Sequence, residues 1–242
     1  MAFKLLGSSC YGCDNPVSGK ALEAGEDRDK WCDTCHDKLT PITRCEMCGV
    51  HTATAMRRCG QCITCPPTWD KLFCVTEYQA PLSGFIHKLK YRRQVWHAKE
   101  LGSLLARQIN DPAPILLSVP LHWRRQLWRG FNQSDYLAGY LQQQFYAYGK
   151  SHVTYLPKAL SRVKVTRNQM GLNRRQRLTN LRKAFLLSPN AVSLLQNQPH
   201  VALIDDVVTT GSTVSEICLL LKEHGVQRID IYCICRASPV TL

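Results

Sequence analysis

Four cysteine pairs stand out in the first third of the chain. Each pair has the spacing Cys-x-x-Cys, and all four lie between residues 10 and 62. Two thiolates three positions apart can chelate one metal ion from a tight turn, and two such turns complete the tetrahedral sulfur site that zinc prefers. The candidate ligands are Cys10, Cys13, Cys32, Cys35, Cys45, Cys48, Cys59 and Cys62. The spacing therefore predicts two zinc ions per chain.

The alternative reading of a Cys-x-x-Cys pair is a redox motif, which usually lies at a helix start within a larger domain. Four copies in one short segment favour metal binding instead. Cys65 forms an overlapping pair with Cys62, so the last ligand stays open, and His36 and His51 are weaker candidates. Residues 1–75 carry nine basic and nine acidic side chains. This neutral balance favours a structural or docking role for the cysteine-rich part.

A second chemical signature lies near the C-terminal end, where an apolar run is followed by two acids and a loop rich in hydroxyl groups. Its residues are Asp205, Asp206, Val207, Val208, Thr209, Thr210, Gly211, Ser212 and Thr213. A helix N-terminus with free N–H groups binds phosphate, and a glycine lets the backbone approach the ligand closely. The two carboxylates would repel a phosphate, so we expect them to face ribose hydroxyls, with Mg²⁺ nearby. The alternative is an ordinary strand-to-helix turn whose acids face solvent.

Residues 121–183 form a strongly basic segment, with 13 Lys and Arg side chains and a single acid. Basic side chains neutralise phosphates, and the tryptophans among the first arginines can stack on unpaired bases. The candidate residues for DNA binding are Trp123, Arg124, Arg125, Trp128, Arg129, Arg162, Lys164, Arg167, Arg174 and Arg175. The alternative is that a few of them bind a diphosphate while the rest form solvated surface.

The elements that must position these groups alternate between strand and helix. Short apolar runs predict strands at 72–78, 115–119, 201–204 and 229–234. Helical spacing of apolar residues predicts helices at 96–109, from Asn132 onward, and at 213–224. We expect Asn132 to be an N-cap, and Thr213 with Glu216 to form a capping box.

This alternation predicts an α/β fold, a parallel sheet with helices on both faces, over residues 68–242. The pair Pro66-Pro67 suits a linker, because proline interrupts helices and central strands. Residues 1–67 then form a separate zinc-binding module. It contains so few large apolar residues that it needs a metal to stabilise it.

The composition excludes several classes of protein. An apolar content of 45% excludes wholesale disorder, and no stretch approaches the roughly 18 apolar residues of a membrane span. The Gly-x-x-x-x-Gly-Lys pattern of a translocating ATPase is absent. Residues 1–6 are too short for the apolar core of a signal peptide. We therefore expect a cytoplasmic protein without membrane insertion, whose 13 cysteines stay reduced and free to bind metal.

The segment 201–213 closely resembles the 5-phosphoribosyl 1-diphosphate signature of the type I phosphoribosyltransferases. The resemblance implies that Asp205 and Asp206 hold ribose hydroxyls and that residues 209–213 hold the 5′-phosphate. This signature marks a superfamily that includes regulators and other non-enzymes, so it does not by itself establish catalysis.

The order of motifs along the chain is more particular. The four cysteine pairs are followed by Leu-Lys-Tyr at 89–91, Val-Pro-Leu at 119–121 and Arg-Gly-Phe-Asn-Gln-Ser at 129–134. This pattern resembles the ComF family, also called ComFC or GntX-like, of bacterial competence proteins. The resemblance covers nearly the whole chain. It implies a zinc-binding N-terminal module, a phosphoribosyltransferase-like domain and a role in taking up or using external DNA.

Three functional hypotheses follow. The first is a competence protein that handles incoming single-stranded DNA and carries a pocket for phosphoribosyl diphosphate or a related sugar phosphate. The second is an active phosphoribosyltransferase of nucleotide salvage, although the sequence shows no recognisable nucleobase pocket. The third is a zinc-anchored adaptor for a DNA helicase.

Overall fold

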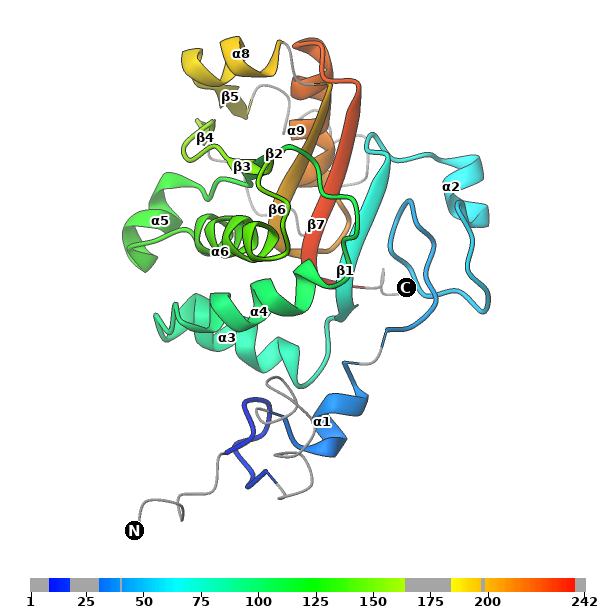
Figure 1. The fold of residues 1–242 in the computed structure, drawn as a ribbon. Helices are drawn as coiled ribbons and strands as arrows, with labels where there is room; N and C mark the ends of the chain where they lie inside the picture. The colour runs from blue at the N-terminus through cyan, green and yellow to red at the C-terminus, as the bar shows by residue number, and fades with distance from the viewer. Residues whose placement is uncertain (1–8, 18–30, 40, 164–183, 197–198, 238–242) are drawn as a thin grey trace.

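The computed structural model describes residues 9–17, 31–39, 41–163, 184–196 and 199–237 (Figure 1). A five-stranded sheet forms its centre, and every neighbouring pair of strands is parallel. The strands, in their order across the sheet, are β1 (Lys71–Glu77), β7 (Arg228–Arg236), β6 (His200–Val208), β2 (Ile115–Ser118) and β3 (Thr154–Tyr155).

Helices cover both faces of this sheet, which explains the apolar runs in its strands. Every residue of β7 after Arg228 is buried, as is typical of a parallel strand packed on two sides. One face packs against α3 (Leu82–Tyr91), α4 (His97–Ala106) and α6 (Gln133–Ala147). The other face packs against α9 (Ser212–Glu223) and α8 (Pro189–Leu195). The antiparallel pair β4 (Leu160–Arg162) and β5 (Phe185–Leu187) joins this second layer. The predicted α/β class, with a parallel sheet and helices on both faces, is confirmed.

Two local expectations at the end of β6 are wrong. The strand does not stop before Asp205 but runs through both acids to Val208. The capping box is absent, because α9 begins after Gly211, a left-handed N-cap residue with no side-chain cap. In contrast, the Asn132 side chain accepts a hydrogen bond from the Ser134 N–H and caps α6 as predicted.

The cysteine pairs lie outside the sheet, next to the short helices α1 (Asp33–Asp37) and α2 (Gly60–Thr64). The segment carrying the first two pairs packs below α3 (Figure 1). There the Trp31 ring stacks on the Phe85 ring, with centroids 5.1 Å apart. The last two pairs lie beside β1, where the Leu72 N–H donates to the Glu46 carbonyl. Among the described residues, no helix is long and apolar enough to cross a membrane.

The contact between Trp31 and Phe85 leads to a stability prediction. Phe85 is 1% exposed, so replacing it with alanine opens a cavity between α3 and the first cysteine segment. We expect Phe85→Ala to lower the free energy of unfolding by about 3–5 kcal/mol, measured by urea denaturation. The control is Tyr146→Ala, because Tyr146 is 71% exposed and its loss should change stability by less than about 0.5 kcal/mol. Equal effects of the two changes would contradict this packing.

Candidate functional site

The direction of the chain connections reverses between β6 and β2, and the region at the carboxyl ends of these two strands is called the crevice here. From β2 the chain continues through α6 to β3, whereas from the neighbouring β6 it continues through α9 to β7, and these helices lie on opposite faces. In open α/β sheets, ligands bind outside the carboxyl ends of the strands at such a reversal. The predicted sugar-phosphate residues occupy the last four positions of β6 and the loop that follows it.

The register of β2 and β6 leaves the last four residues of β6 without a strand partner on the β2 side. Ser118, the last residue of β2, pairs with Ile204, so residues 205–208 continue beyond β2. The start of α6 lies beside them. The Asn132 side-chain amide donates to the Val119 carbonyl at 3.1 Å, and the Ser134 hydroxyl donates to Asp205 Oδ1 at 3.3 Å. The segment 129–134 therefore links the ends of β2 and β6.

The two acids differ in their partners. Lys90 Nζ of α3 lies 2.8 Å from Asp206 Oδ2, and the Asp206 side chain is only 5% exposed. Burial, together with the charge of Asp206, raises the pKa of Asp205 to about 7, despite the opposing effect of Lys90. Asp205 therefore changes its protonation state near neutral pH, whereas Asp206 has a cationic partner.

Residues 209–213, predicted to bind phosphate, cover the loop between β6 and α9 and the start of α9, and this loop is called the phosphate loop here. Gly211 has a φ of +76°, and a Cβ atom at this position would lie 2.6 Å from Cη2 of Trp69, so only glycine fits. The hydroxyls of Thr210 and Ser212 are 2.8 Å apart, and Thr209 and Thr210 are exposed. The N-cap residue Gly211 provides no side-chain cap, and the Ser212 N–H makes only a long contact of 3.4 Å with Thr210 Oγ1, so the start of α9 offers N–H groups to an anion.

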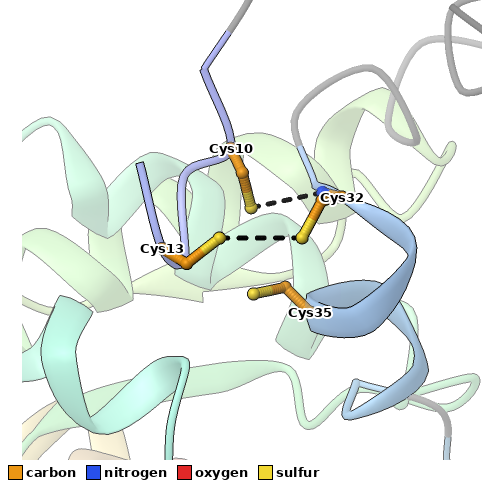
Figure 2. Close-up of side chains that lie close together, drawn as sticks. All are labelled: Cys10, Cys13, Cys32 and Cys35. Carbon is orange, nitrogen blue, oxygen red and sulfur yellow. Dashed lines mark hydrogen bonds between the residues drawn. The ribbon is translucent and has the colours of Figure 1, made fainter. Parts of the chain in front are cut away.

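The structure brings the eight predicted cysteines together in two groups of four. One group is Cys10, Cys13, Cys32 and Cys35, and the other is Cys45, Cys48, Cys59 and Cys62. Within each group all sulfur atoms lie within 4.8 Å of one another. Figure 2 shows the first group, with its four side chains converging from a turn and from the start of α1. Four converging thiols fit a tetrahedral zinc ion, so each group can hold a metal.

The two groups are built alike. The sulfur of Cys10 accepts the Cys32 N–H at 3.2 Å, and the sulfur of Cys45 accepts the Cys59 N–H at the same distance. Burial opposes ionisation of the Cys45 thiol, but backbone N–H groups that point at its sulfur lower its pKa to about 7. Burial likewise opposes ionisation of the Cys10 thiol, and backbone N–H groups lower its pKa to about 7. Each group thus contains one thiol prepared for the thiolate form that binds metal.

The predicted DNA-binding residues fall into three places. Trp123, Arg124, Arg125, Trp128 and Arg129 lie on the helix α5 (Trp123–Arg129). Arg162 lies on β4. Burial lowers the pKa of its guanidinium, and the nearby charge of Arg125 lowers it further. Lys164, Arg167, Arg174 and Arg175 lie outside the described residues.

Helix α5 presents a surface that is both aromatic and basic. Trp128 is 67% exposed and Leu127 is 74% exposed, and the Arg124 guanidinium lies 5.2 Å from the Trp123 ring centroid. Arg129 differs, because it is buried and donates to Gln133 Oε1 at 3.1 Å. Its guanidinium lies 5.1 Å from the Tyr91 ring, and Tyr91 in turn contacts Trp128 edge-on.

Several residues at the crevice have no local signal in the sequence. Lys90, Ser134 and Trp69 reach the acids and the loop from segments distant in the chain. Lys90 and Ser134 fall within the short motifs at 89–91 and 129–134, and these motifs are the only sign in the sequence that the two residues belong to a site. Trp69 has none.

The metal content of the protein tests the cysteine groups. We expect two zinc ions per chain in protein purified without chelator, because each group offers four converging thiols. Cys13→Ser and Cys59→Ser should each remove one ion, whereas Cys65→Ser should remove none, because Cys65 lies outside both groups. Elemental analysis with thiol titration measures this. A metal content near zero, with every thiol reactive, would contradict the assignment.

Comparison with known proteins points in the same direction. The model of the phosphoribosyl transferase domain matches residues 153–239, which include β6 and the phosphate loop. DNA utilization protein YhgH of Escherichia coli K12 is 36% identical over 215 residues, which cover 85% of this chain and 89% of that protein. Competence protein F of Haemophilus influenzae is 33% identical over 214 residues, which cover 85% of this chain and 90% of that protein. With this similarity over most of its length, the chain belongs to the ComF family of competence and DNA utilization proteins.

Proposed function

We propose that the protein handles single-stranded DNA in the cytoplasm during the use of external DNA, and that it binds a phosphoribosyl diphosphate or related sugar phosphate in the crevice. One observation carries the proposal: helix α3 contacts both candidate sites, because its Lys90 pairs with Asp206 while its Tyr91 contacts Trp128 of α5. The names of the relatives support the DNA role. The match to the phosphoribosyl transferase domain supports the sugar-phosphate ligand.

In the crevice, the acids and the loop serve different parts of the ligand. Carboxylates accept hydrogen bonds from ribose hydroxyls, so Asp205 and Asp206 would hold the sugar. The backbone N–H groups and hydroxyls of residues 209–213 would hold the 5′-phosphate. These carboxylate oxygens fit Mg²⁺, which binds proteins through one or two carboxylates and takes further oxygens from phosphate and water. When bound with the ligand, Mg²⁺ would neutralise part of the diphosphate charge.

On the surface of α5, DNA would be held by charge and by stacking. Arg124 and Arg125 are exposed and can neutralise the backbone, while Trp123 and Trp128 offer ring faces to unpaired bases. Arg129 is buried, so we assign it a positioning role: it supports Tyr91, which contacts Trp128. Lys164, Arg167, Arg174 and Arg175 stay candidate DNA contacts on the basis of their charge alone.

Phosphoribosyl transfer is the second candidate, and the pair of Asp206 with Lys90 favours it. Lys90 provides a positive charge beside the acids, of the kind that can stabilise a developing anion in a group transfer. A helicase adaptor is the third candidate, and it would require neither ligand. The two binding experiments below separate these functions.

The first experiment tests the crevice. Phosphoribosyl diphosphate with Mg²⁺ should raise the melting temperature of the protein, because a ligand that binds only the folded state stabilises it. Asp205→Asn with Asp206→Asn should abolish this rise without unfolding the protein. An unchanged rise in the double variant would place the ligand elsewhere.

The pH dependence of the same binding tests Asp205. Its folded pKa of about 7 lies above its unfolded value, so the stability that its protonated form contributes is lost as the pH rises from about 4 to about 7. A ligand that needs the ionised carboxylate gains affinity as the pH rises through the folded pKa. We expect the affinity for phosphoribosyl diphosphate to rise between about pH 6 and pH 8. Asp205→Asn should flatten the rise. A pH profile identical to that of the wild-type protein would contradict this role.

The second binding experiment tests α5. Trp128→Ala should weaken binding of single-stranded DNA by about 1–3 kcal/mol without changing its salt dependence, because stacking involves no counterions. Arg124→Gln with Arg125→Gln should reduce the slope of log K against log salt by about 1.4, since each phosphate contact to a single strand contributes about 0.7. Fluorescence anisotropy over a salt series measures both effects.

Tyr146→Ala is the matched control, because it removes an exposed aromatic ring at the opposite end of α6. It should leave DNA affinity unchanged. Equal affinity for single strands, duplex and heparin would remove the single-strand claim and favour phosphoribosyl transfer.

A further inference from the structure

The turn at the second cysteine group makes two contacts with the core that no sequence motif indicates. The backbone carbonyl of Met47 accepts the Trp69 indole N–H at 2.7 Å. The backbone carbonyl of Cys48 accepts the Arg236 Nε–H at 2.9 Å. Trp69 and Arg236 are both buried, so neither contact competes with water. The position of this turn is set by the group itself, since Cys45 and Cys48 are two of its four members.

Trp69 carries the first contact to the far end of the phosphate loop. Its ring lies against Gly211, so closely that a Cβ atom there would overlap Cη2 and lie 3.3 Å from Cζ3. Gly211 is buried and is also the N-cap of α9. The Trp69 ring therefore packs against the residue at which the loop ends and α9 begins.

Arg236 carries the second contact to the near end of the same loop. Its Nη1 lies within hydrogen-bond distance of the Val208 carbonyl at 2.9 Å, the Thr209 carbonyl and the Ala237 carbonyl at 2.6 Å, which share its two hydrogens. A planar guanidinium with several donors can hold such a set of carbonyls at once, which a lysine ammonium cannot reproduce. The two contacts thus hold the loop at its start and at its end.

We infer that the second cysteine group, through the positioning residues Trp69 and Arg236, sets the conformation of the phosphate loop. Metal bound by Cys45, Cys48, Cys59 and Cys62 would hold the turn at Met47 and Cys48, and the turn would hold the loop in its ligand-binding form. Loss of that metal would loosen the loop and weaken sugar-phosphate binding. The link to ligand affinity rests on the proposed function, whereas the link to loop conformation does not.

The first cysteine group provides a matched control within the same chain. It has the same ligands and the same internal hydrogen bond, but its segment packs on α3 through Trp31 and Phe85 and through the ion pair of Asp14 with Lys88. Removing one thiol from each group therefore compares two similar metal losses at different places. Cys13→Ser and Cys59→Ser are suitable, because neither residue contacts the loop through its carbonyl.

The experiment measures backbone amide exchange over residues 208–214 in the full-length protein, together with metal content. Cys59→Ser should lose one metal ion and exchange these amides about tenfold faster or more, because local opening becomes easier when buried hydrogen bonds lose their support. Cys13→Ser should lose one ion and leave the exchange as in the wild-type protein. Unchanged exchange in Cys59→Ser after metal loss, or equal acceleration in both variants, would overturn the inference.

Trp69→Phe and Arg236→Lys keep both metal groups intact and so guard against an unfolded Cys59→Ser variant. Trp69→Phe removes the indole donor to Met47 and the part of the ring that contacts Gly211, so it should accelerate loop exchange. Combined with Cys59→Ser, it should add little, since contacts in one pathway are not additive. Wild-type exchange in both Trp69→Phe and Arg236→Lys would also overturn the inference.

Titration with phosphoribosyl diphosphate then separates this inference from the proposed function. If the ligand binds, its dissociation constant should rise about tenfold or more in Trp69→Phe and in Arg236→Lys, but not in the surface control Tyr146→Ala. If the wild-type protein fails to bind it, the proposed ligand is wrong, and the exchange data still decide whether the cysteine group controls the loop.

Discussion

The continuation of β6 beyond the end of β2 is the constraint on which the rest of the structure depends. It leaves Asp205 and Asp206 without a neighbouring strand on the β2 side. Ser134 of α6 and Lys90 of α3 provide their partners instead. Because two carboxylates at the end of a buried strand are costly unless they are paired and hydrogen-bonded, these partners are needed for the fold as well as for a ligand. The residues that stabilise the two carboxylates in the fold are therefore the same residues that lie beside the proposed ligand.

The cysteine groups support the two sides of this crevice from outside the sheet. The first group lies under α3, the helix that brings Lys90 to Asp206 and Tyr91 to Trp128. The second lies behind the phosphate loop, at the carbonyls of Met47 and Cys48. A segment with few large apolar side chains can hold these positions only if something other than a large core makes it rigid, and a metal bound by four converging thiols would provide that rigidity.

The sequence was sufficient where the signal is local. The cysteine pairs and the apolar runs predict both sulfur groups and the parallel sheet, because ligand spacing and two-sided burial leave direct patterns. It failed at the end of β6, since two acids look like a strand terminus when their partners are unknown. Lys90 lies 116 positions before Asp206, and Trp69 lies 142 positions before Gly211, so neither contact has a local pattern. Such long-range pairs are set by how the helices pack on the sheet.

The most direct test of the crevice is a crystal structure of the protein with phosphoribosyl diphosphate and Mg²⁺. We predict the 5′-phosphate within hydrogen-bond distance, about 2.7–3.2 Å, of the backbone N–H groups of residues 209–213. The ribose hydroxyls should contact Asp205 and Asp206. A ligand bound instead at the α5 surface, with the loop and both acids untouched, would contradict the assignment of the crevice as the sugar-phosphate site.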